Sequence, residues 1–308
     1  MIQSSSFIKR VFKEILIFFK IGIFTCTIFY LIPVCIYAYT QGGSSSLSVE
    51  TYTLTNGDKT LVFQSMYHIG LRSFYQNVGE EMTDYRNKGY RVFLEGIGST
   101  GYKPLRKNDD GYEQAVDDYK KLYKDKWSKM LDDMNDKSAF KRSKYTYQSI
   151  DLTRYIAYDD EYADLSYITI DQLIDDKAKI AGMDSSFVLN YKETRTDYSY
   201  SSSVDMLKNN ERLYIFLKNV ENYPLFSFLD KITLPLLGYF SPTIKLNKEI
   251  TINSRDKNLV EHILNEPEKL VYVTYGADHF DGVFKGLKEI DSRWKIVKTT
   301  KKNVFSVY

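Results

Sequence analysis

The sequence predicts an α/β protein with a mostly parallel central sheet flanked by helices and one N-terminal transmembrane helix. Three observations carry this prediction. A run of 19 uncharged residues lies near the N-terminus. Short apolar runs rich in β-branched residues recur along the rest of the chain, and stretches with apolar residues at helical spacing separate them. Strands that alternate with helices in this way are typical of parallel sheets.

The composition excludes some classes of function. Lys and Arg number 42 and Asp and Glu number 40, so the charges nearly cancel and give no electrostatic argument for binding nucleic acid. Its two cysteines, Cys26 and Cys35, both lie in the apolar N-terminal run. The rest of the chain therefore has neither internal disulfides nor cysteine ligands for a metal.

The N-terminal run, Ile21–Tyr39, is long enough to cross a bilayer as a helix, which needs about 20 residues. Four basic residues precede it, and no Lys or Arg lies between Tyr39 and Asp58. The positive-inside rule then places residues 1–20 in the cytoplasm. We expect a single-pass membrane protein whose soluble domain lies on the non-cytoplasmic side. A cleaved signal peptide is the alternative, although its apolar core would be shorter, at ~7–15 residues.

Residues 40–48 are rich in Gly and Ser, which predicts a flexible linker. The remaining residues, 49–308, are enough for one large domain with its own core. Its first elements are a buried strand over Lys59–Met66 and a helix over Leu71–Lys88 that ends at Gly89. A second buried strand follows over Tyr90–Leu94. Strand, helix and strand at this spacing predict a βαβ unit with parallel strands.

The later elements follow from the same periodicities. Apolar residues at helical intervals predict a long amphipathic helix within Lys103–Lys144 and a helix over Leu207–Val220. Leu225–Phe240 is apolar but interrupted, which favours a buried helix or a membrane-surface contact over a second span. The C-terminal part is predicted to contain a short helix around residues 259–264, a buried strand over Leu270–Tyr275, a helix over Phe280–Ile290 and two strand pieces within Trp294–Tyr308.

Three polar residues follow the three predicted buried strands. His68 comes after the first strand, Glu95 after the second and His279 after the third. The carboxyl ends of parallel strands line the crevice where ligands bind. Two imidazoles and a carboxylate can hold a divalent metal such as Mn, Co or Zn, which would activate water for hydrolysis. In the alternative, each is an ordinary hydrogen-bonded residue at a strand end.

His262 lies within the short predicted helix, beside Glu261. We interpret it as a surface residue and not as a ligand.

Several motifs follow one another in an order that resembles a known family. A strand ends in QSMYHIG, which approximates a GxxH motif with Ser65 in place of Gly. A second strand ends in Glu, in RVFLEGI. Gln148 and the segment ADLSYITIDQL follow, then the pair Arg255-Asp256, and finally GADH after the third strand. This order resembles the TraB/GumN-like family, which includes the Tiki metalloproteases, within the erythromycin-esterase/ChaN-like superfamily.

The resemblance implies an α/β domain that gathers these His, Glu and Arg positions at one site. It implies His68, Glu95 and His279 as metal ligands, with Glu95 and Arg255 as catalytic groups. Arg255 would stabilise an oxyanion or a substrate carboxylate; a structural ion pair with Asp256 or Glu95 is the alternative. Family members cleave peptides outside the cell with a metal, or antagonise a secreted peptide pheromone.

Two functions of different kinds follow as hypotheses. One is a membrane-anchored, metal-dependent hydrolase that acts on peptides. The other is a non-catalytic module on the same fold that binds a peptide or a small ligand. A tethered structural protein with an inactive site is a third reading, and Ser65 in the first motif is its only support.

Overall fold

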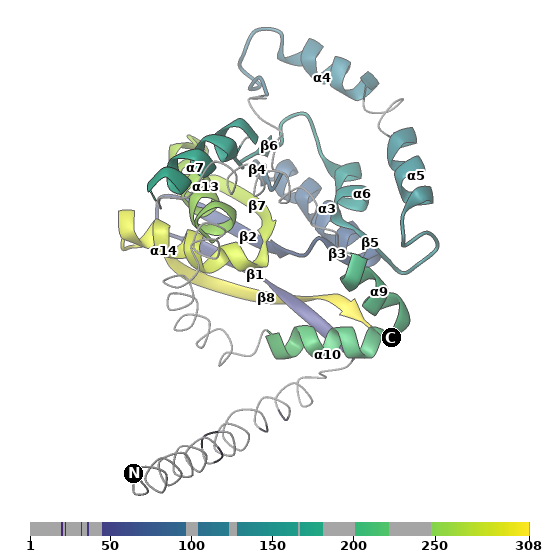
Figure 1. The fold of residues 1–308 in the computed structure, drawn as a ribbon. Helices are drawn as coiled ribbons and strands as arrows, with labels where there is room; N and C mark the ends of the chain where they lie inside the picture. The colour runs from purple at the N-terminus through teal and green to yellow at the C-terminus, as the bar shows by residue number, and fades with distance from the viewer. Residues whose placement is uncertain are drawn as a thin grey trace, which may run out of the picture. The chain divides into compact units, whose positions relative to one another are not determined.

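The structure is a computed structural model that describes residues 45–96, 104–122, 128–165, 167–180, 201–221 and 248–307, together with Lys20, Gly22, Ile32 and Ile36. Figure 1 labels helices and strands of the described residues. The chain divides into two compact units. The larger unit comprises residues 48–204 and 234–306 and contains the sheet. In the smaller unit, the described residues are 45–47, 205–221 and 307, together with Lys20, Gly22, Ile32 and Ile36.

Six strands of the described chain form the main sheet, in the order β6-β4-β7-β2-β1-β8. Three neighbouring pairs, β6 with β4, β4 with β7 and β7 with β2, are parallel, whereas β1 and β2 are antiparallel. The expected α/β fold with a mostly parallel sheet is therefore confirmed. The strands are β1 (Ser46–Thr55), β2 (Thr60–Met66), β4 (Arg91–Leu94), β6 (Glu161–Tyr162), β7 (Leu270–Gly276) and β8 (Lys295–Ser306).

The three predicted buried strands are β2, β4 and β7, and they are parallel in one sheet as expected. Strand β7 lies between β2 and β4, so the two strands of the βαβ unit are not neighbours. Phe63 and Phe93 both pair with Val273 across this centre. All three side chains are at most 1% exposed. Buried on both faces, such strands read as continuous apolar runs, which is why the sequence revealed them.

Helices cover both faces of the sheet. On one face, α13 (Ser254–Asn265) and α14 (Phe280–Ile290) pack against Phe63, Phe93 and Val273 in a core that includes Trp294. Helix α3 (Arg72–Asn87) contacts β4, and its Tyr85 stacks on Tyr272 of β7. Each large apolar side chain buried in this way contributes roughly 1.5–3 kcal/mol.

The end of α3 follows the predicted signal. Gly89 has a φ of 83°, a left-handed conformation that side chains with a Cβ disfavour. Its N–H donates to Arg86 O at 3.0 Å, and Tyr90 N–H donates to Tyr85 O at 3.0 Å. These bonds satisfy carbonyls that the end of the helix would leave free.

The remaining elements connect the sheet or lie outside it. A small antiparallel sheet pairs β3 (Ile69–Leu71) with β5 (Tyr145–Tyr147). The other helices are α4 (Tyr112–Leu122), α5 (Ser128–Lys137), α6 (Gln148–Asp151), α7 (Tyr167–Ile180), α9 (Ser201–Asn209) and α10 (Glu211–Glu221). Short turns of other helical type cover Leu152–Tyr155, Glu249–Asn253 and Ala277–His279.

Three sequence predictions differ from these elements. The helix within Lys103–Lys144 does not start until Tyr112, because residues 104–106 are irregular and residues 107–111 form turns and a bend, and α5 ends at Lys137. Leu207–Val220 is divided between α9 and α10 at Asn210. The two strand pieces at the C-terminus are one strand, β8.

The N-terminal predictions lie largely outside the described residues, as does Leu225–Phe240. Ile21–Tyr39 contains only Gly22, Ile32 and Ile36 of the described set. Among the helices that the structure describes, none has the length and apolar character needed to span a bilayer. Strand β1 begins at Ser46, so the last three residues of the predicted linker, 46–48, are strand.

Candidate functional site

Five polar residues meet where the parallel strands end. Glu95 follows β4, Asp164 comes two residues after β6, and His279 closes the turn after β7. Arg255 and Asp256 are the second and third residues of α13, which packs on the same face of the sheet. Parallel strands bring their carboxyl ends to one edge, so residues distant in sequence converge there. We call these five residues the Arg255 cluster.

Arg255 is the centre of this cluster. Its Nη2 donates to Glu95 Oε1 at 2.5 Å and to Asp164 Oδ2 at 2.6 Å, and its Nε donates to Asp164 Oδ1 at 2.9 Å. Its Nη1 lies 3.4 Å from Thr251 O and 3.2 Å from His279 Nε2. A guanidinium has five N–H donors, and all five have a partner here. Arg255 therefore holds its neighbours in place, and an oxyanion would have to displace one of them.

The contacts of His279 assign its protons. Nδ1 lies 2.6 Å from Asp256 Oδ1, and Nε2 faces Arg255, which can only donate. A neutral ring that donates from Nδ1 and accepts at Nε2 satisfies both contacts. Asp256 thus orients His279. Of the two ion pairs expected for Arg255 in the sequence-based alternative, the one with Glu95 is present and the contact of Asp256 is with His279 instead.

Two glycines leave space for these side chains. A Cβ on Gly276 would lie 3.2 Å from the His279 ring and 3.4 Å from Glu95 Oε2. A Cβ on Gly282 would lie only 1.8 Å from Asp256 Oδ2, which is an impossible contact. Gly276 opens the GADH motif and Gly282 follows it in α14. The motif therefore has a steric reason, because the cluster packs against backbone at both positions.

Burial and charge set the protonation of the carboxyl groups. Burial alone would raise the pKa of Asp164, but the hydrogen bonds and charge of Arg255 outweigh it, so that this pKa lies below its ordinary value. Burial raises the pKa of Asp256 against the opposing effect of His279. Burial and then the charge of Asp164 raise the pKa of Tyr275, whose ring lies 5.2 Å from the Arg255 guanidinium carbon. The Tyr275 hydroxyl therefore stays neutral.

One atom of the cluster has no partner among the residues described. Glu95 Oε1 is held by Arg255, but Glu95 Oε2 is buried and makes no hydrogen bond. A buried carboxylate oxygen without a donor is costly, by about 1–3 kcal/mol or more. Such an atom marks a place where a water molecule or a substrate donor would bind.

The structure brings together Glu95, Arg255 and His279 but shows no contact between them and His68. The His68 side chain is exposed, and its backbone oxygen accepts a hydrogen bond from Gln148 N at 2.9 Å. Two of the family-like elements, the first His motif and Gln148, are therefore adjacent through the backbone.

The described cluster does not fit the divalent metal that the sequence predicts. Glu95 Oε1 and His279 Nε2 both contact Arg255, whose fixed positive charge would repel a metal ion bound there. Within the described residues, no group of three His, Cys, Asp or Glu side chains is placed to hold a metal ion.

Sequence reasoning missed two residues of the cluster. Asp164 lies within the segment that resembles the family's motif, yet its clamp on Arg255 was not predicted. Asp256 was predicted as a partner of Arg255, and its contact with His279 was not. One signal was present in the sequence. Gly282, just after GADH, indicates that a side chain lies too close to this position to leave room for a Cβ.

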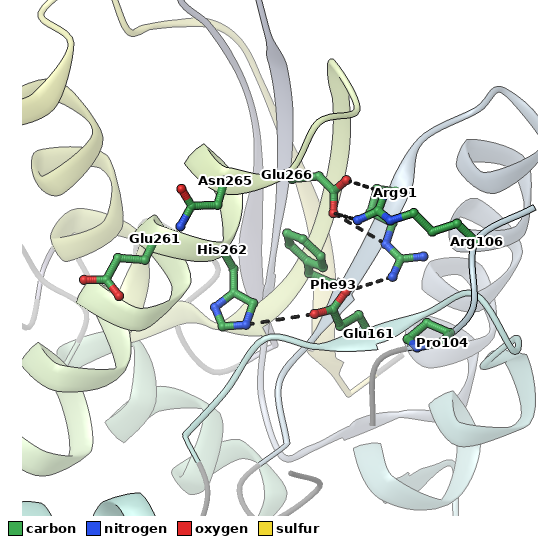
Figure 2. Close-up of a pocket in the computed structure, with 9 residues that line it drawn as sticks. All are labelled: Arg91, Phe93, Pro104, Arg106, Glu161, Glu261, His262, Asn265 and Glu266. Atoms are coloured by element: carbon green, nitrogen blue, oxygen red, sulfur yellow. Dashed lines mark hydrogen bonds and ion pairs between the residues drawn. The ribbon is translucent and has the colours of Figure 1, made fainter. Parts of the chain in front are cut away.

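His262 is less exposed than predicted. Its side chain is 29% exposed and lines a pocket at the other end of the strands (Figure 2). It takes no part in the Arg255 cluster.

Comparison of the chain with protein-family models, with curated proteins and with solved structures gives no match. The resemblance to the TraB/GumN-like family therefore stays a prediction from the motifs.

Proposed function

We propose that this protein is a membrane-anchored hydrolase that cleaves peptides at the Arg255 cluster, with Glu95 as general base. The observation that carries the proposal is the Glu95 carboxylate, which has one oxygen fixed by Arg255 and the other buried without a partner among the described residues. The choice of a peptide as substrate rests on the family resemblance alone.

The chemistry needs few groups. Glu95 Oε2 takes a proton from a water molecule as that water attacks the substrate carbonyl carbon, and later returns the proton to the leaving amine. Arg255 orients Glu95 through the hydrogen bond to Oε1. Asp256 holds His279 in place. His279 contacts the same arginine, Arg255, as Glu95 does.

The test compares Glu95→Gln with wild type in the full-length chain. Peptide cleavage is followed by mass spectrometry on a mixed peptide library. We expect Glu95→Gln to lower the rate at least about 100-fold, since general bases contribute on the order of 10²–10⁴. Glu289→Gln, at an exposed position of α14, is the matched control and should cleave normally.

Two further experiments test the role of Arg255 and the need for a metal. Arg255→Lys should reduce turnover, because an ammonium cannot reproduce the planar fork that holds Glu95 and Asp164. Loss of cleavage with a chelator, restored by Mn, Co or Zn, would show that a metal takes part after all. No cleavage of any peptide by wild type would refute the hydrolase.

The burial of the cluster favours a function without catalysis, and the second candidate is therefore a non-catalytic module that binds a peptide or small ligand. The side chains of Arg255 and Glu95 are only 9% and 7% exposed, and that of Asp164 is fully buried. A network this enclosed can serve to hold the sheet edge together. Stoichiometric peptide binding without product would support this function.

The membrane anchor is part of the proposal and has its own test. The basic residues before Ile21 predict that the domain lies on the non-cytoplasmic side. Protease added outside intact cells should therefore digest the domain. Digestion only after lysis would reverse this topology.

A further inference from the structure

A second polar site lies at the opposite edge of the sheet. A pocket of about 230 Å³ opens beside the amino ends of the parallel strands. Arg91 begins β4, Glu161 begins β6, and Glu266 precedes β7. Helix α13 contributes His262, and Phe93 of β4 contributes an apolar wall (Figure 2). The Arg255 cluster lies at the carboxyl ends, so the two sites are distinct.

The positive charges of this pocket are already neutralised. Arg106 Nη1 lies 2.9 Å from Glu266 Oε1 and 2.6 Å from Glu268 Oε2. Arg91 donates to Glu161 Oε2 at 2.8 Å and to the backbone oxygen of Asp159. Two arginines and three glutamates line the pocket, the third being Glu261. The lining residues alone therefore carry a negative excess, with Lys257 3.9 Å from Glu261 as a further ion-pair partner, and they do not favour an anion.

His262 and Glu161 face each other across a gap into which none of the described residues donates a hydrogen bond. His262 Nδ1 lies 2.9 Å from Asn258 O, and because a carbonyl can only accept, Nδ1 carries the proton. Nε2 of the neutral ring is then an acceptor. It points at Glu161 Oε1, another acceptor, at 4.0 Å, which is too long for a hydrogen bond (Figure 2).

The width of the gap discriminates between ligands. A metal ion binds nitrogen and oxygen at about 2.0–2.2 Å, so these two atoms would have to lie almost opposite each other across it. That geometry is far from tetrahedral. A nitrogen donor about 2.9 Å from each atom fits the gap without any movement. The two acceptors and the negative excess together call for a donor with positive charge.

We propose that this pocket binds a primary ammonium group, with the ammonium between His262 Nε2 and Glu161 Oε1 and its alkyl chain against Phe93. An ammonium has three donors and no acceptor, which suits a site whose unpaired atoms are acceptors. A lysine side chain and a free alkylamine share this chemistry.

The test uses n-butylamine with the full-length chain at pH 8, where an alkyl ammonium is charged and a free imidazole is neutral. The chain has three histidines, so the His262 imidazole resonance can be assigned with His262→Phe. We expect this resonance to shift and saturate with n-butylamine, and not with butyramide, which is of similar size but neutral. Nα-acetyl-lysine N-methylamide, added in a second titration, shows whether a lysine side chain reaches the same site.

Variants locate the site. Glu161→Gln places an amide donor against His262 Nε2 and removes the charge, so amine binding, measured by saturation-transfer NMR, should weaken at least about tenfold. His262→Phe should weaken binding as well, and it leaves the pairing of Arg91 with Glu161 untouched. Glu113→Gln, on the exposed side of α4, is the control and should bind like wild type.

Equal responses to butyramide and n-butylamine would overturn the proposal, because a bridging water molecule would then explain the gap. Binding of n-butylamine that survives both Glu161→Gln and His262→Phe would overturn it too.

Discussion

Replacement of Arg255 by Ala should lower the unfolding free energy of the domain far more than a surface substitution does. The change leaves Glu95 and Asp164 buried without their cation. Removing one partner of a buried ion pair costs about 3–5 kcal/mol of unfolding free energy. For a domain of this size, we expect the Tm to fall by on the order of 10 °C. Urea unfolding at pH 7 measures the free energy directly.

The matched control is Arg293→Ala. Arg293 also contacts two carboxylates, Asp58 and Asp291, but its side chain is 60% exposed. Water solvates those carboxylates when the arginine is removed, so the loss should be much smaller. Similar losses in the two variants would contradict the central role of Arg255.

At acidic pH, the unfolding free energies of wild type and Arg255→Ala should differ less than they do at pH 7. The pKa of Asp164 in the folded protein lies below its ordinary value of 3.8. Asp164 therefore contributes stability above that pH and loses it as the pH falls through the lower folded pKa. In the variant, protonation instead relieves the unpaired charge. A difference that stays constant down to pH 3 would show that the loss at neutral pH comes from packing.

Gly282→Ala should disrupt the cluster through a single methyl group. The new Cβ would lie 1.8 Å from Asp256 Oδ2, so the carboxylate must move away from His279 Nδ1, which it now contacts at 2.6 Å. We expect a loss of about 1–3 kcal/mol, the usual cost of overpacking. This loss would occur although Ala is about 1 kcal/mol better than Gly in a helix. Urea unfolding measures the loss, and the His279 imidazole resonance should shift as well.

Gly286→Ala is the control for this prediction. Gly286 lies one turn later in α14, and its Cβ would meet a Val260 methyl at 3.0 Å, a contact that a small adjustment relieves. Both variants gain the same helix propensity, so their difference isolates the contact with Asp256. If both variants unfold at the same urea concentration, the steric role of Gly282 is wrong.

The strands that could be predicted are those that consist of a continuous apolar run, because such a run indicates a strand buried on both faces. The apolar runs around Phe63, Phe93 and Val273 revealed three parallel strands. Strand β1 was missed because half-buried and buried residues largely alternate along it, beside a segment rich in Gly and Ser. The position of β7 between β2 and β4 was not predicted either, because strand order depends on contacts between distant segments.

The candidate site was predictable to a similar degree. Placement at strand ends correctly brought Glu95 and His279 to one edge, because that follows from parallel topology. Which residues hydrogen-bond to each other depends on the exact positions of their side chains in the folded protein. The spacing of residues along the sequence does not give these positions. Asp164 is the clearest case, since its two bonds to Arg255 join residues 91 positions apart.

The central place of β7 also determines when the domain can assemble during synthesis. Strands β2 and β4 are complete by Leu94, but the strand that joins them is Leu270–Gly276. A nascent chain therefore carries two apolar strands with unpaired edges for most of translation. Arg255 and His279 are also synthesised long after Glu95, so the Arg255 cluster cannot form until then. Such long-range pairing slows folding and exposes the chain to aggregation. The main sheet can close only once Leu270–Gly276 has emerged, close to the end of the chain.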